Sequence, residues 1–265
     1  MYNIDHSLRA SLSCSISVVI IYIILICSIS LNPPNTALAT VEENQPNINA
    51  TSVFDTGQMV LGDNVKHLII LIPDKGHHGP GELDEARFIA QPFVPQHAVV
   101  TPGTQVVWFS GNVGHVHNIV ARDANSSNNN TIFETGDFPE FATTRAITFN
   151  KTGTFDYADT TDYEGGFRMT GDITVVNGGN SSDMPGNTFD TVGVLMVPTM
   201  IVQDVVSGMR SGGFGIDSMH NFKDLRGGQS GTGDEQTLVV WKTGGKSLEE
   251  IISQLQEIST GLPYH

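Results

Sequence analysis

The feature that most constrains the fold is a series of short apolar runs between residues 66 and 178, separated by turn residues. The runs are too short for core helices and carry almost no helical periodicity, whereas strands of a sandwich or barrel have this length and spacing. Their positions are residues 67–73, 87–94, 98–109, 116–121, 145–149, 153–158 and 171–176. This part of the sequence therefore predicts a mainly β domain.

The pattern changes in residues 190–265. A strand-type run precedes Pro198, and apolar residues at helical spacing follow it. A second strand-type run at residues 238–241 is followed by Ser247 and Glu250, which have the spacing of a helix capping box. The pattern predicts two β-α units, which form either a small appended domain or an extension docked on the β domain.

The N-terminus has the three-part layout of a secretory signal peptide. Arg9 precedes an apolar run at residues 15–31, and a small-residue site ends at Ala39. We expect residues 1–39 to be this leader, with residues 15–31 retained as a membrane anchor in the alternative case. Residues 40–65 are polar and are interpreted as a spacer. The layout favours an extracytoplasmic location: secreted, periplasmic or at the cell surface.

Composition excludes several classes of function. The formal net charge of -15 argues against nucleic acid as a partner, because a phosphate backbone needs a basic face. Both cysteines, Cys14 and Cys27, lie in or beside the expected leader, so the mature chain would have neither a disulfide nor a thiolate ligand. No serine-nucleophile, phosphate-loop or helical zinc motif occurs, which favours a binding protein over an enzyme.

Two segments carry a family resemblance. Residues 99–120 (VVTPGTQVVWFSGNVGHVHNIV) contain the pair His117-Asn118, and residues 153–175 place Met169 two positions before a glycine. Both segments resemble, in the right order, the cupredoxin family of plastocyanin and azurin. The resemblance implies a Greek-key β-sandwich in which His117 is the first copper ligand and Met169 lies in the ligand loop. The expected fold class is thus a cupredoxin-like sandwich at residues 66–178 with a C-terminal α/β extension.

The sequence departs from the family at the ligand loop. Counting forward from Gly153, the place of the family's cysteine falls on Asp159. The place of its second histidine falls on Asp162 or, counting back from Met169, nearer Glu164. A type 1 copper centre requires the thiolate for its colour and potential. The sequence therefore does not predict blue copper.

Imidazole and carboxylate groups remain as candidate ligands. His115 and His117 are two positions apart, so on a strand both rings face the same side. Two imidazoles with carboxylates suit Cu(II), Zn(II) or non-haem iron, and copper is the metal that the resemblance implies. The candidate ligands are His117, His115, Asp159, Asp162, Glu164 and Met169.

Three functions remain open. The first is an exported metal-binding protein for electron transfer or copper handling, which acts with a redox or membrane-complex partner. The second is a metal-free sandwich that binds a partner at the cell surface, with His115 in a turn, the loop carboxylates solvated and Met169 in the core. The third is a small mononuclear-metal enzyme.

Overall fold

The computed structural model describes residues 48–73, 91–111, 114–123, 130–161, 169–178, 189–223 and 235–261. All of these residues belong to one unit, residues 45–265. The expected leader and the candidate ligands Asp162 and Glu164 lie outside the described residues. No helix in the described ranges is long and apolar enough to cross a membrane.

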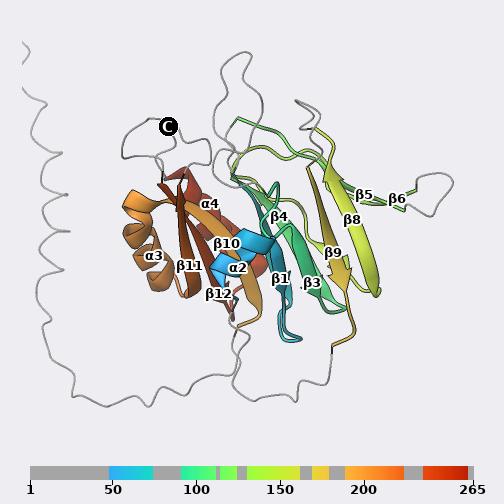
Figure 1. Ribbon diagram of the computed structural model, residues 1–265, viewed down its shortest axis with the longest axis horizontal. Coiled ribbons are helices and arrows are strands. Elements are labelled where there is room, and N and C mark those ends of the chain that lie inside the picture. Colours follow the sequence, from blue (N-terminus) through green and yellow to red (C-terminus); the bar gives the residue numbers. More distant parts are fainter. Residues whose placement is uncertain are drawn as a thin grey trace, which may run out of the picture. The chain divides into compact units, whose positions relative to one another are not determined.

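The described residues form two six-stranded sheets (Figure 1). Sheet A has the strand order β1 (Gln58–Val60), β3 (His97–Val100), β9 (Thr170–Val175), β8 (Gly153–Asp159), β5 (Ile119–Arg122) and β6 (Thr131–Glu134). Sheet B has the order β11 (Gly215–Lys223), β12 (Glu235–Thr243), β10 (Thr191–Pro198), β2 (His67–Ile72), β4 (Thr104–Ser110) and β7 (Ile147–Phe149). The mainly β sandwich class expected from the sequence is confirmed.

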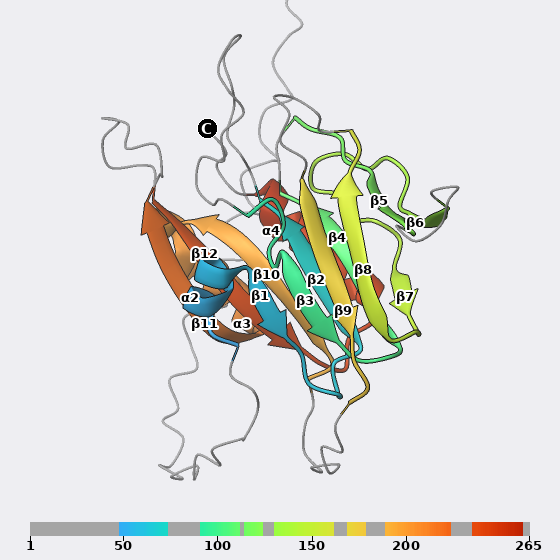
Figure 2. The same ribbon diagram turned by 45° about the vertical axis from the view of Figure 1, so that its right-hand side comes forward.

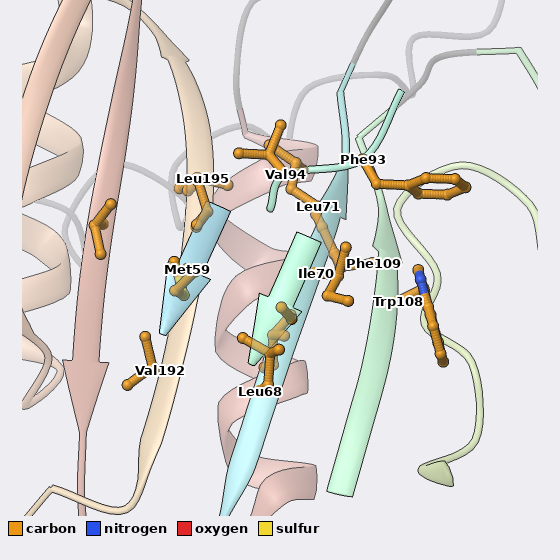
Figure 3. Packing of buried hydrophobic residues seen from close by; sticks show 14 of the residues in the cluster. Met59, Leu68, Ile70, Leu71, Phe93, Val94, Trp108, Phe109, Val192 and Leu195 are labelled. Carbon is orange, nitrogen blue, oxygen red and sulfur yellow. The ribbon is translucent and has the colours of Figure 1, made fainter. Parts of the chain in front are cut away.

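The two sheets pack face to face through aromatic side chains. Trp108 of β4 meets Tyr157 of β8 edge-on, with 5.1 Å between ring centroids, and Phe133 of β6 lies 5.7 Å from Trp108. Figure 3 shows part of the neighbouring core, which includes Met59 of β1 and Leu68 and Ile70 of β2. These residues are almost completely buried. The sandwich core therefore lies between sheets A and B.

The C-terminal segment extends sheet B. Strand β10 pairs in parallel with β2 and antiparallel with β12, which in turn pairs with β11. Helix α3 (Val202–Ser211) contacts β10 and β11, and helix α4 (Leu248–Thr260) lies behind sheet B as seen from β3 and β9 (Figure 2). The expected C-terminal α/β extension is thus confirmed, and it shares a sheet with the sandwich.

Coverage of the sheets explains the sequence patterns. All eight residues of β10 and five of the six residues of β2 are buried, because sheet A covers one face of sheet B and helices cover the other. Strands covered on both faces have continuous apolar runs. Strands β3 and β9 of sheet A instead alternate between buried and more exposed residues, as expected for a sheet with one face in water.

The N-terminal part differs from the expected polar spacer. Helix α2 (Ala50–Thr56) is followed directly by β1, which pairs in parallel with β3. The Ser218 hydroxyl of β11 accepts from the Ala50 N–H at 2.7 Å and donates to the Ile48 carbonyl at 2.6 Å. Phe54 stacks on Phe222. Residues 48–60 are ordered by these contacts with distant strands, which local sequence does not reveal.

Helix α4 begins as the sequence predicts. The Ser247 hydroxyl accepts from the Glu250 N–H, and the Glu250 carboxylate accepts from the Ser247 N–H at 2.8 Å. This reciprocal pair is the predicted capping box. Ile251 and Leu255 form the buried stripe of the helix.

Stability should depend on pH through His67, where β2 meets β10. Its Nδ1 lies 3.0 Å from the Thr191 hydroxyl. Burial lowers the pKa of His67; Asp190 and Glu249 oppose this shift, and Lys66 adds to it. The unfolded chain therefore binds a proton more readily, and His67 stabilises the fold above its unfolded pKa of about 6.5 but loses this contribution as the pH falls further.

The matched variant is His67→Gln, which keeps a polar group near Thr191. We expect the unfolding free energy of the wild type to fall more steeply than that of the variant between about pH 6.5 and pH 5. The difference should stay below about 1 kcal/mol, because the ring is only half-buried. Urea titrations at several pH values measure it, and parallel curves would contradict this role for His67.

Candidate metal centre

His117 lies just before β5, and two backbone hydrogen bonds to Phe138 hold it in place. Its N–H donates to the Phe138 carbonyl at 3.0 Å, and the Phe138 N–H donates back to the His117 carbonyl at 2.9 Å. The two rings have centroids 5.8 Å apart. The imidazole is completely buried. A fully buried histidine is unusual unless its polar atoms are engaged, so both ring nitrogens matter.

Asp159 at the end of β8 engages the first nitrogen. Its Oδ2 lies 2.6 Å from His117 Nδ1, and both side chains are completely buried. The register of β5 and β8 explains the meeting, because Ile119 pairs with Asp159 and His117 lies two residues earlier on the same face. The structure thus brings together His117 and Asp159, two of the candidate ligands expected from the sequence.

The other oxygen of Asp159 has donors of its own. The backbone N–H groups of Asn118 and Thr161 donate to Oδ1 at 3.1 and 3.0 Å, and the Thr161 hydroxyl lies 2.9 Å away. Burial raises the pKa of Asp159, but the hydrogen bonds from His117, Thr161 and Asn118 and the charge of His117 outweigh burial and leave the pKa lowered. Asp159 is therefore held as a carboxylate.

The second nitrogen of His117 has a different environment. Nε2 is buried and has no hydrogen-bond partner among the described residues. An unpaired buried polar atom costs free energy and calls for an explanation, such as an ion that belongs there. This orphaned atom is an observation that fits a metal site.

His115 lies beside this ring. The two imidazole centroids are 6.5 Å apart and their planes differ by 22°. His115 is half-buried, and the intervening Val116 is 48% exposed. The two histidines therefore share one side of the chain, with His117 in the interior and His115 toward solvent.

Met169 adjoins the same cluster through its backbone. The Asp159 N–H donates to the Met169 carbonyl at 3.0 Å, and the Met169 side chain belongs to the buried core. Asp162 and Glu164 lie outside the described residues. Within the described ranges, no three His, Cys, Asp or Glu side chains are arranged to hold a metal ion.

Asn118 and Thr161 are site residues that the sequence reasoning missed as supports. The side-chain amide of Asn118 donates to the Glu134 carboxylate at 3.0 Å. The backbone carbonyl of Asn118 accepts from the Thr160 N–H. The Thr161 hydroxyl lies 2.6 Å from the Val116 carbonyl. These contacts tie the ends of β5 and β8 together around Asp159. The only sequence signal for them was the His-Asn pair itself.

A second histidine–carboxylate pair lies on the exposed face of sheet A. His97 Nδ1 is hydrogen-bonded to Asp172, and the His97 side chain is 46% exposed. The pair borders an open depression of about 630 Å³ that also includes Asp156 and Arg122. Because this pair is accessible to water, it is a natural comparison for the buried pair.

Comparisons with solved structures return matches of low similarity. A Cu-containing nitrite reductase from Thermus scotoductus matches with a TM-score of 0.27 and 22% identity, over 32% of this chain and 20% of that one. Auracyanin from Roseiflexus castenholzii matches with a TM-score of 0.30 and 16% identity, over 42% of this chain and 97% of that one. Rusticyanin from Thiobacillus ferrooxidans matches with a TM-score of 0.32 and 16% identity, over 45% of this chain and 82% of that one.

Comparisons of the sequence return nothing. No protein-family model matches it, and no curated protein matches it.

Proposed function

We propose that this chain is an exported, cupredoxin-like protein that binds a metal ion at His117, with copper as the preferred metal. The observation that carries the proposal is the buried Nε2 of His117, which has no hydrogen-bond partner among the described residues while Nδ1 is held by a carboxylate. Metal-binding histidines commonly have this arrangement, with one nitrogen on a carboxylate and the other on the metal. The leader pattern at residues 1–39 supports export.

In this proposal the remaining donors come from nearby chain. His115 supplies the second imidazole from beside His117. Asp162 and Glu164 follow Thr161 in the sequence and supply hard oxygens, and Met169 serves as a weak ligand. Such a set accepts Cu(II), Zn(II) or iron and lacks a thiolate. It predicts a weakly coloured site.

The proposed role is electron transfer or copper handling with a redox or membrane-complex partner. Bound copper would supply the one-electron chemistry. The chain itself holds the His117 ring in the sandwich interior, away from water, and places His115 at the surface next to an exposed Val116. The buried His117 ring would hold the metal in a fixed position, while the half-buried His115 ring contacts solvent.

Metal retention by the full chain, prepared without metal, tests the proposal. We expect the wild type to retain one equivalent of Cu(II) after desalting and His117→Ala to bind at least about tenfold more weakly, because it loses the buried imidazole. The matched control is His97→Ala, which removes the other carboxylate-paired histidine of sheet A and should retain the metal. Elemental analysis and the EPR spectrum provide the measurements.

The same experiment can contradict the proposal in two ways. If the wild type retains no stoichiometric Cu(II), Zn(II) or iron, the metal-binding function is wrong. If an intense visible band and a small copper hyperfine splitting appear, the site is a type 1 centre and the imidazole–carboxylate donor set is wrong.

One observation favours a second candidate, a metal-free sandwich for partner binding. Four protein groups, namely His117 Nδ1, the Asn118 N–H, the Thr161 N–H and the Thr161 hydroxyl, lie within hydrogen-bond distance of the Asp159 carboxylate. A pair of this kind stabilises a fold without a metal. Failure of metal retention together with normal stability would favour this candidate.

A further inference from the structure

The two carboxylate oxygens of Asp159 have different hydrogen-bond partners. Oδ1 faces the backbone N–H groups of Asn118 and Thr161, and Oδ2 faces His117 Nδ1 at 2.6 Å. A carboxylate offers only acceptors, so the nitrogen that bonds to it must carry a proton. His117 Nδ1 therefore carries a proton, and the tautomer that can bind a metal is the one whose lone pair lies on Nε2.

We propose that Asp159 is a positioning residue rather than a metal ligand, and that it makes His117 bind metal through Nε2. This inference rests on the proposed metal-binding function. It also revises the ligand set expected from the sequence, in which Asp159 took the place of a ligating cysteine. Two backbone N–H groups hold the Asp159 carboxylate in place through Oδ1. Its Oδ2 is hydrogen-bonded to His117 Nδ1 and so fixes both the orientation and the tautomer of the His117 ring.

The variant Asp159→Asn tests this role because the surroundings dictate how the amide sits. Its oxygen must take the Oδ1 position, where two backbone N–H groups donate, so its NH₂ group faces His117 Nδ1. An NH₂ group donates, and Nδ1 must then be the acceptor. The ring proton moves to Nε2, which loses the lone pair that a metal needs. The substitution changes the tautomer with little change in shape.

Ring-nitrogen NMR of the full chain labelled with ¹⁵N-histidine, without metal, gives the direct readout. We expect the wild type to show His117 with a protonated Nδ1 and an unprotonated Nε2, and Asp159→Asn to show the reverse. On titration with Zn(II), the Nε2 resonance of wild-type His117 should shift. The zinc affinity of Asp159→Asn should be lower by about 10–100-fold.

The matched control is Asp172→Asn, which alters the exposed carboxylate partner of His97. It should leave the His117 tautomer and the zinc affinity at wild-type values. If wild-type His117 carries its proton on Nε2, or if zinc shifts Nδ1 instead, the proposal is overturned. The wild-type spectrum decides this even if Asp159→Asn fails to fold.

Failure of the inference and failure of the proposed function are distinguishable. If the wild type has the Nδ1–H tautomer but no metal is retained, Asp159 controls the ring as proposed and the metal-binding function is overturned. If metal is retained through Nδ1, the metal-binding function stands and the role of Asp159 is overturned.

Discussion

Replacing Asp159 with alanine should lower the free energy of unfolding by about 3–5 kcal/mol, the range found when one partner of a buried pair is removed. The reason is the number of donors left unpaired. His117 Nδ1 loses its acceptor in a region closed to water, and the backbone N–H groups of Asn118 and Thr161 lose theirs in part-buried positions. Each buried donor left unsatisfied costs about 1–3 kcal/mol, and partial relaxation keeps the sum within this range. Urea denaturation of both chains measures the difference.

The control is Asp156→Ala, three residues earlier on the same strand. Asp156 is exposed, so its removal should change the unfolding free energy by no more than about 0.5 kcal/mol. Equal effects of the two substitutions would show that the buried network around Asp159 does not contribute to the fold. Because the loss is measured without metal, the result is independent of the proposed function.

The meeting of Asp159 with His117 could be anticipated in part from the sequence. Counting from Gly153 placed Asp159 at the family's cysteine position, and the structure brings it to 2.6 Å from His117. Strand periodicity carries this information, because it defines which residues of β5 and β8 face inward. The role of Asp159 did not follow from the sequence, since it depends on two backbone N–H groups that only the folded chain places beside Oδ1.

The elements that the sequence missed are those ordered by distant contacts. Strand β11 has a largely polar sequence, and its pairing with β12 makes it a strand. Helix α2 is only seven residues long and depends on Ser218 and Phe222 of β11. Helices this short are not stable alone in water, so tertiary packing decides them.

A register change explains the different position of Met200. The spacing after Pro198 predicts Met200 on the apolar face of a helix, but its side chain is 77% exposed. Residues Thr199–Ile201 form a 3₁₀ turn, and α3 begins only at Val202. Three residues per turn instead of 3.6 rotate the preceding positions away from the stripe formed by Val206 and Met209. The helix was predictable, whereas its first turn was not.

Replacing Gly193 with alanine should lower the free energy of unfolding by about 3 kcal/mol, the upper end of the usual cost of overpacking. Gly193 lies directly opposite Trp241 in the pairing of β10 with β12. A Cβ atom at this position would lie 2.3 Å from the Trp241 ring. The indole is completely buried and meets Phe214 edge-on at 5.1 Å, so it cannot move aside without disturbing the layer between sheet B and its helices. Urea denaturation measures the loss.

The matched control is Gly208→Ala on the exposed side of α3. Nothing lies within 4 Å of the added methyl group, and alanine favours a helix over glycine, so this variant should be more stable by about 0.5–1 kcal/mol. The same chemical change therefore has opposite signs at two positions of the C-terminal extension. If Gly193→Ala proves neutral, Trp241 does not pack closely on β10, and the tight contact between β10 and β12 inside the extension is not present. A loss at Gly193 with a gain at Gly208 would show that this contact is a tight part of the core.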